Sequence, residues 1–146
     1  MKAKLFGIFL LFFIVSATVY SQSAKVIDKI INAQALTCGD ACYIAGIVAG
    51  IIDDDTSSKD ALEKFRSVKG LENVTTDELI RYDVFASLIM HAGKVKESIW
   101  YNLYKNPHYA FRYFKMAGLV DEKTFPSSHV VPRDAMYIIS KLSKEK

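Results

Sequence analysis

Apolar residues recur at helical spacing along most of the chain, whereas the alternation of apolar and polar residues that marks a β-strand is scarce. Residues typical of helix boundaries flank several of these stretches. Thr37 and Asp40 have the spacing of a capping box at a helix start. Asn106 and Pro107 are typical of a second start, and Gly118 is typical of the corresponding end. The chain is therefore predicted to form a small all-α domain.

Serine, glycine and proline residues set the other helix boundaries. Ser57 or Ser58 can cap a helix that stops before Gly70, and Pro132 opens the last helix. A short helix is also expected after Lys96. The remaining expected helices cover approximately residues 24–35, 37–52, 57–68, 76–92, 106–118 and 132–142.

The first twenty-one residues differ from the rest of the chain. Lys2 and Lys4 precede an unbroken apolar run, residues 5–15, and small or polar residues follow it. These are the three parts of a secretory signal peptide, here residues 1–21. We expect cleavage before Gln22 and export to the periplasm or the cell surface.

Two alternatives concern this segment. Ala17 offers a second position for cleavage, because small side chains are required just before the cut. An uncleaved membrane anchor would need about 20 apolar residues to cross the hydrocarbon core. The apolar run ends well short of that length, so no membrane contact is expected after cleavage.

Net charge excludes one class of partner. The whole chain carries a formal charge of +3, and removal of residues 1–21 takes away two lysines and no acidic residue. The remaining domain, residues 22–146, is close to neutral. It has no basic excess for binding a phosphate backbone, so a nucleic-acid partner is not expected.

Three segments share a weak internal repeat. Each has an apolar residue, a helix start, an acidic residue in the first turn and then an apolar helix. The repeat aligns Arg81 and Arg133 with Cys38 at the helix starts, and Asp83 and Asp134 are acids of the first turns. An acid there is favoured by the positive end of the helix dipole. The segments are residues 36–45, 79–88 and 131–139.

The last segment continues a longer motif. In order it contains His-Tyr-Ala at 108–110, Ala-Gly-Leu-Val at 117–120, Phe-Pro at 125–126 and Val-Pro-Arg-Asp at 131–134. In these residues the chain resembles the S-layer homology domain family. The resemblance implies one helical domain made of three units, approximately residues 22–70, 71–105 and 106–146.

The resemblance also implies a function. In that family an arginine of the repeated turn helps to bind an anionic cell-wall polysaccharide in grooves between repeats, so Arg81 and Arg133 inherit this role and Cys38 does not. The chain departs from the family pattern in three ways. Phe125 and Pro126 are adjacent, Pro132 replaces a threonine, and the acid follows Arg133 without a spacer.

Cys38 and Cys42 are the only cysteines, and they lie four residues apart at a helix start. In an exported chain an even pair suggests a disulfide, provided that the helix is distorted there or starts after Cys38. A buried, inert thiol at Cys42 and a redox-active pair are the alternatives. The histidines have no spacing that would recruit a metal, so neither a metal nor a cofactor is expected.

The sequence contains none of the common catalytic motifs, so an enzyme is not predicted. We expect an exported binding module that attaches to a cell-wall polysaccharide or a peptidoglycan-linked polymer. The alternative is an envelope protein that docks on another protein through the aromatic surface between Trp100 and Phe114. The residues predicted to bind the ligand are Arg81, Arg133, Asp83, Asp134, Trp100 and Tyr109.

Overall fold

The computed structural model describes residues 24–93, 102 and 105–144. These residues form helices joined by turns and by short extended segments, which pair only at isolated bridges. The predicted all-α class is confirmed. The predicted signal peptide, and the short helix expected around Trp100, lie outside the described residues.

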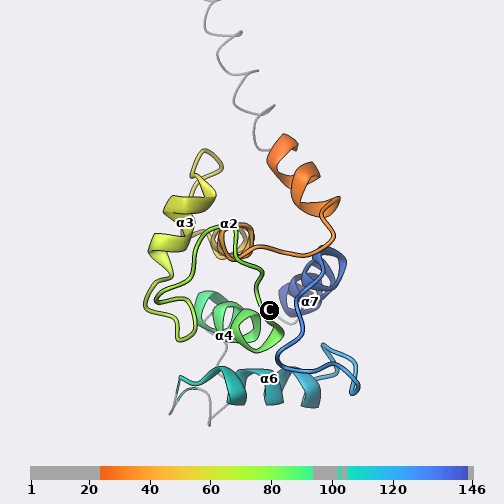
Figure 1. Cartoon of the computed structure of the whole chain (residues 1–146). Helices are drawn as coiled ribbons and strands as arrows, with labels where there is room; N and C mark the ends of the chain where they lie inside the picture. The colour runs from red at the N-terminus through yellow and green to blue at the C-terminus, as the bar shows by residue number, and fades with distance from the viewer. Residues whose placement is uncertain (1–23, 94–101, 103–104, 145–146) are drawn as a thin grey trace, which may run out of the picture.

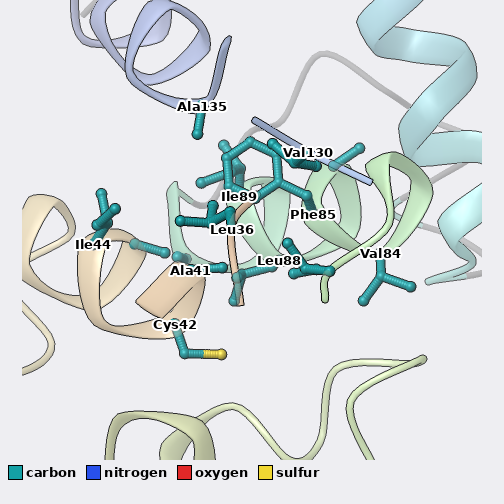
Figure 2. Packing of buried hydrophobic residues seen from close by; sticks show 14 of the residues in the cluster. Leu36, Ala41, Cys42, Ile44, Val84, Phe85, Leu88, Ile89, Val130 and Ala135 are labelled. Carbon is teal, nitrogen blue, oxygen red and sulfur yellow. The ribbon is translucent and has the colours of Figure 1, made fainter. Parts of the chain in front are cut away.

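Three helices form the middle of the molecule, and we call them the inner helices (Figure 1). Their buried faces meet in one apolar cluster. Figure 2 shows part of that cluster, with Leu36 and Val130 lying close to Phe85 and Ile89. The inner helices are α2 (Cys38–Val48), α4 (Tyr82–Gly93) and α7 (Pro132–Lys144).

Three further helices lie around the inner ones, and we call them the outer helices (Figure 1). In the chain each outer helix precedes an inner one, and α3 packs against α2 while α6 packs against α4. Ser57 caps α3, so the structure selects the first of the two serines considered. The outer helices are residues 24–31, α3 (Ser58–Lys64) and α6 (Pro107–Met116).

A closed ring of backbone hydrogen bonds holds the three inner helix starts together. The amide of Leu36 donates to the carbonyl of Val130 at 2.8 Å, that of Val130 to Ile80 at 3.0 Å, and that of Ile80 to Leu36 at 3.0 Å. We call these three the ring residues. All three are buried, so each amide and carbonyl in the ring finds its partner away from water.

Beside the ring, a non-helical segment crosses the start of α2, and we call this contact the first joint. The amides of Cys38 and Gly39 donate to the carbonyls of Glu78 at 2.7 Å and Thr76 at 3.0 Å. These donors belong to the first turn of a helix, whose amides have no partner within the helix. The connecting segment, residues 65–79, therefore supplies the acceptors that α2 lacks.

The second joint repeats this arrangement at the start of α4. The amides of Tyr82 and Asp83 donate to the carbonyls of Ser128 at 3.0 Å and Pro126 at 3.1 Å. Residues 117–129 thus cross α4 as residues 65–79 cross α2.

The closing joint lies at the start of α7, where residues 32–35 form the connection. Among the described residues, the bond from Leu36 to Val130 is the one backbone hydrogen bond that this connection and its ring residue make to the chain around α7. Pro132, the first residue of α7, has no amide hydrogen to donate.

Local signals placed several helix ends, but four boundaries differ from expectation. The first helix ends at residue 31 rather than near residue 35, and α3 ends at Lys64 rather than near residue 68. Thr37 and Asn106 cap α2 and α6 as predicted, and Gly118 has the predicted positive φ of 64°. The helix expected over 76–92 begins only at Tyr82, because Thr76 and Asp77 form a turn and the carbonyls of Thr76 and Glu78 are bonded to α2 at the first joint. Likewise α2 ends at Val48 rather than near residue 52, before a turn that contains Gly50 at φ 66°.

Candidate functional site

A cavity of about 530 Å³ lies beside the first joint. One part of its wall comes from the connecting segment, between Lys69 and Leu79, and the other from the starts of α4 and α6. Small-molecule pockets commonly have volumes of about 300–1,000 Å³. Of the residues predicted to bind ligand, Arg81 and Asp83 line this cavity.

Arg81 lies immediately before α4 and is held by an acid of the same turn. Its Nε donates to Oδ1 of Asp83 at 3.1 Å, and its Nη2 donates to Oδ2 of the same carboxylate. The hydrogen bond and the charge of Asp83 raise the pKa of Arg81. The Arg81 side chain is 51% exposed and that of Asp83 only 12%. A guanidinium has five N–H donors, so this pair leaves Arg81 donor capacity for a ligand.

Asp83 is fixed by more than its arginine. Its Oδ1 also accepts the amide of Val84 at 2.9 Å, and its own amide is bonded to Pro126 at the second joint. Because several bonds hold this carboxylate, it orients the guanidinium of Arg81 at the cavity wall.

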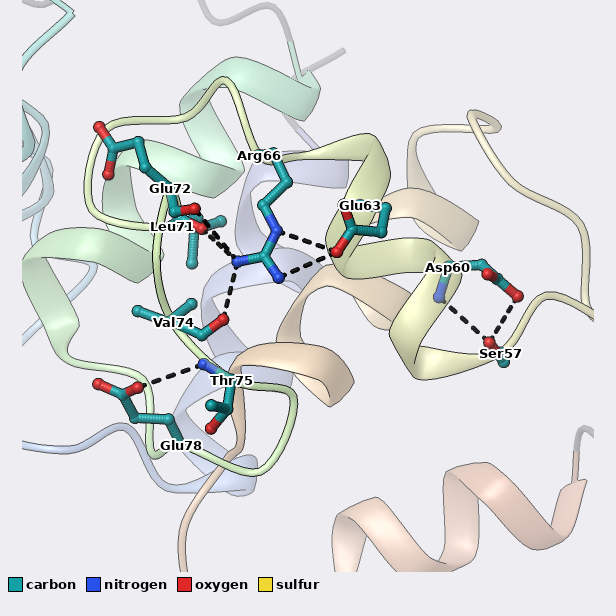
Figure 3. Close-up of polar contacts among 9 residues, drawn as sticks. All are labelled: Ser57, Asp60, Glu63, Arg66, Leu71, Glu72, Val74, Thr75 and Glu78. Carbon is teal, nitrogen blue, oxygen red and sulfur yellow. Dashed lines mark hydrogen bonds and ion pairs between the residues drawn. The ribbon is translucent and has the colours of Figure 1, made fainter.

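The connecting segment is held in place by Arg66, which follows the end of α3 (Figure 3). Its Nη1 donates to the carbonyls of Leu71 at 2.9 Å and Val74 at 2.7 Å. Its Nε and Nη2 donate to Oε1 of Glu63, at 3.1 and 2.9 Å. One side chain thus ties α3 to the loop that forms part of the cavity wall.

Arg133 and Asp134 lie elsewhere. Arg133 is the second residue of α7, whereas Arg81 precedes the first residue of α4. The expectation that these two arginines occupy matching positions is therefore wrong, since the ring residues Ile80 and Val130 set a different register. The Arg133 side chain is 92% exposed, and its Nε lies 3.7 Å from Oδ1 of Asp134. Such an exposed pair contributes little to stability.

Asp134 has a structural partner. The hydroxyl of Tyr82 donates to its Oδ2 at 2.6 Å, joining the start of α4 to the start of α7. Burial, and then the bond to Asp134, raise the pKa of Tyr82, while a backbone hydrogen bond from Val131 lowers it. This carboxylate connects two inner helices and does not line the cavity.

The aromatic residues of α6 point mostly into the protein. Phe111 and Phe114 are buried, and Tyr109 is partly buried with its ring in edge contact with His108. Tyr109 does not line the cavity, and Trp100 lies outside the described residues. Phe111 and Phe114, which belong to the aromatic surface expected to dock on another protein, are therefore part of the core.

The structure keeps Cys38 and Cys42 as free thiols, so the predicted disulfide is not formed. Both lie within α2, where side chains one turn apart do not reach disulfide geometry without distortion. Burial raises the pKa of Cys38 to about 11 and that of Cys42 to about 12. Thiols with raised pKa values are weak nucleophiles at neutral pH, which agrees with the inert-thiol alternative.

Neither a metal-binding cluster nor a membrane-spanning helix is found in the described part of the chain. It contains no group of three or more His, Cys, Asp or Glu side chains placed to hold a metal ion. It also contains no helix long and apolar enough to cross a membrane.

Sequence reasoning missed several residues of the cavity. Glu72, Glu78 and Lys69 line it from the connecting segment, which was expected to be partly helical. His108, which also lines the cavity, belongs to the His-Tyr-Ala motif of the resemblance but was not predicted to bind a ligand. The ion pair of Arg66 could be inferred from its spacing of three residues from Glu63 on the expected helix. Its hydrogen bonds to main-chain carbonyls could not, because every residue has a carbonyl.

No protein-family model matches the chain, and no curated protein or solved structure matches it either. Any functional inference therefore depends on the chemistry of the cavity. That cavity offers charged donors and acceptors around a space of ligand size, which is the chemistry of binding.

Proposed function

We propose that the protein is an exported, non-enzymatic module that binds a polymer of the cell envelope in the cavity beside the first joint, with Arg81 as its main donor. The observation that carries the proposal is the guanidinium of Arg81, oriented by Asp83 in the wall of a cavity of ligand size. Planar guanidinium groups bind carboxylates and similar anions through paired hydrogen bonds.

Two further observations support this reading. The ring of Leu36, Ile80 and Val130 takes one residue from each of the three units that the S-layer homology resemblance implies. The apolar segment at residues 5–15 supports export, because it has the pattern of a signal peptide. Together they favour a wall-binding or envelope-binding role at the periplasm or cell surface.

Sedimentation of the purified protein with cell-wall sacculi tests the proposal. Arg81→Ala should reduce the bound fraction by about tenfold or more, because a lost charged hydrogen bond is worth about 1.5–3 kcal/mol. Arg133→Ala is the matched control, since this arginine is exposed and lies outside the cavity. Its binding should equal that of the parent.

Circular dichroism of both variants checks that helicity is unchanged. Binding that survives Arg81→Ala, or that is lost equally with Arg133→Ala, would contradict the proposed site.

A further inference from the structure

The connecting segment gives its part of the cavity wall a negative charge. It contributes Glu72, Glu78 and one cation, Lys69. Oε2 of Glu72 accepts the amide of Gly70 at 2.6 Å, and Oε2 of Glu78 accepts the amide of Thr75 at 3.3 Å. Each carboxylate is thus positioned by its own backbone and has a second oxygen to offer an ammonium group.

The helix starts give the rest of the wall the opposite character. Arg81 lies at the start of α4 and Asn106 at the start of α6, so the positive ends of two helix dipoles adjoin the cavity. Asp83 balances the formal charge of Arg81 but leaves its guanidinium with N–H donors. This part of the wall suits a carboxylate.

The charges of the whole lining are therefore mixed. The lining contains two basic residues, Lys69 and Arg81, and three acidic residues, Glu72, Glu78 and Asp83. A polyanion would meet three carboxylates in the cavity, and a neutral glycan would leave charged groups unpaired, which is costly where water is displaced. A ligand that carries both signs of charge finds a partner for each.

From this distribution we infer that the cavity binds a zwitterionic peptide segment, with a free amine at Glu72 and Glu78 and a carboxylate at Arg81. Peptide cross-bridges and stem peptides of a cell-wall polymer have this chemistry. The inference rests on the proposed function and names the part of the polymer that is bound. Leu79, which is 40% exposed, offers apolar contact for the aliphatic part of such a peptide.

Calorimetric titration of the whole protein tests the inference with four probes. The first is a synthetic Ala-Glu-Lys-Ala tetrapeptide with a free lysine amine and free carboxylates. The second is the same peptide acetylated on its amines, and the third has its carboxylates amidated. The fourth is an N-acetylglucosamine oligomer without peptide. We expect the free peptide to bind and the sugar oligomer not to bind. The affinity of each blocked peptide should be lower than that of the free peptide by a factor of about ten or more.

Variants locate the amine. Glu72→Gln combined with Glu78→Gln should weaken binding of the free peptide and remove its advantage over the acetylated one. Glu122→Gln is the matched control, because Glu122 is exposed and lies in residues 117–129 at the second joint. It should change neither the affinity for the free peptide nor the difference between the free and the acetylated peptide. Both substitutions keep side-chain volume, and helicity reports whether the fold is retained.

The outcomes separate the two proposals. If acetylation does not weaken binding, or if the sugar oligomer binds and the peptide does not, the zwitterionic ligand is wrong, while sedimentation that depends on Arg81 would still support envelope binding. If sedimentation does not depend on Arg81 and no probe binds, both proposals fail.

Discussion

Each of the first and closing joints lies beside one ring bond, but the two joints differ in what covers the helix start. At the first joint, residues 65–79 place two carbonyls over the first amides of α2. At the closing joint the connection is only residues 32–35, and α7 opens with Pro132. The long connection forms part of a cavity, and the short one leaves Arg133 almost fully exposed.

The difference shows that the ring and the cavity depend on different parts of the chain. Leu36, Ile80 and Val130 close the ring with one residue each, whatever the length of the connection before them. The cavity requires a connection long enough to cross a helix start and a side chain, here Arg66, to hold it there. A wall of this kind exists at the first joint.

The ring predicts the largest effect. Leu36→Ala and Ile80→Ala should each lower the free energy of unfolding by about 2–5 kcal/mol, because both side chains are fully buried. The two losses should be similar, since the two side chains have the same number of carbon atoms and are equally buried in one apolar cluster. Urea denaturation measures both. A loss below about 1 kcal/mol for Leu36→Ala alone would show that the closing joint does not hold this residue.

The first joint and the closing joint also differ in how closely the second residue of the inner helix is packed. In α2 it is Gly39, where an added Cβ would overlap Cγ2 of Thr76 and lie 3.2 Å from Cβ of Ser58. Gly39→Ala should therefore cost about 1–3 kcal/mol, although alanine normally favours a helix. In α7 the same position is Arg133, and Arg133→Ala should change stability by no more than about 0.5 kcal/mol.

Thermal unfolding of these two variants gives the comparison directly. A stabilised Gly39→Ala protein would mean that the connecting segment does not press on α2.

Tyr82 predicts a smaller effect at the closing joint. Tyr82→Phe removes the hydroxyl that donates to Asp134, and the expected loss is about 1 kcal/mol because Asp134 is partly open to water. Tyr137→Phe, on a half-exposed side chain of α7, is the control and should be neutral. Equal unfolding midpoints for the two variants would show that the Tyr82 bond does not stabilise the start of α7.

Most of the fold followed from local chemistry. Thr37, Asn106 and Gly118 act at a distance of a few residues, so a single sequence is enough to interpret them. The non-helical path of residues 76–80 depends on amides of Cys38 and Gly39, about forty residues earlier. No local pattern reports such pairing, and the helical spacing that continues into Tyr82 therefore predicted too early a start.

The candidate site was predicted in part for the same reason. Arg81 and Asp83 were found because an arginine and an acid at a helix start have a recognisable spacing. Arg133 was paired with Arg81 by that spacing alone, whereas the register is set by the ring residues. Glu72 and Glu78 were missed because their role depends on where the loop runs, which Arg66 decides through main-chain carbonyls.

The closed ring has a consequence for assembly. In a head-to-tail series each segment bonds to the next one. Such a series either closes on its first segment or continues from molecule to molecule into an open filament. Here the amide of Leu36 is bonded to Val130 of the same chain, so the series ends within one molecule. Pro132 acts in the same direction, because the start of α7 has one amide donor fewer for an extended strand of another chain.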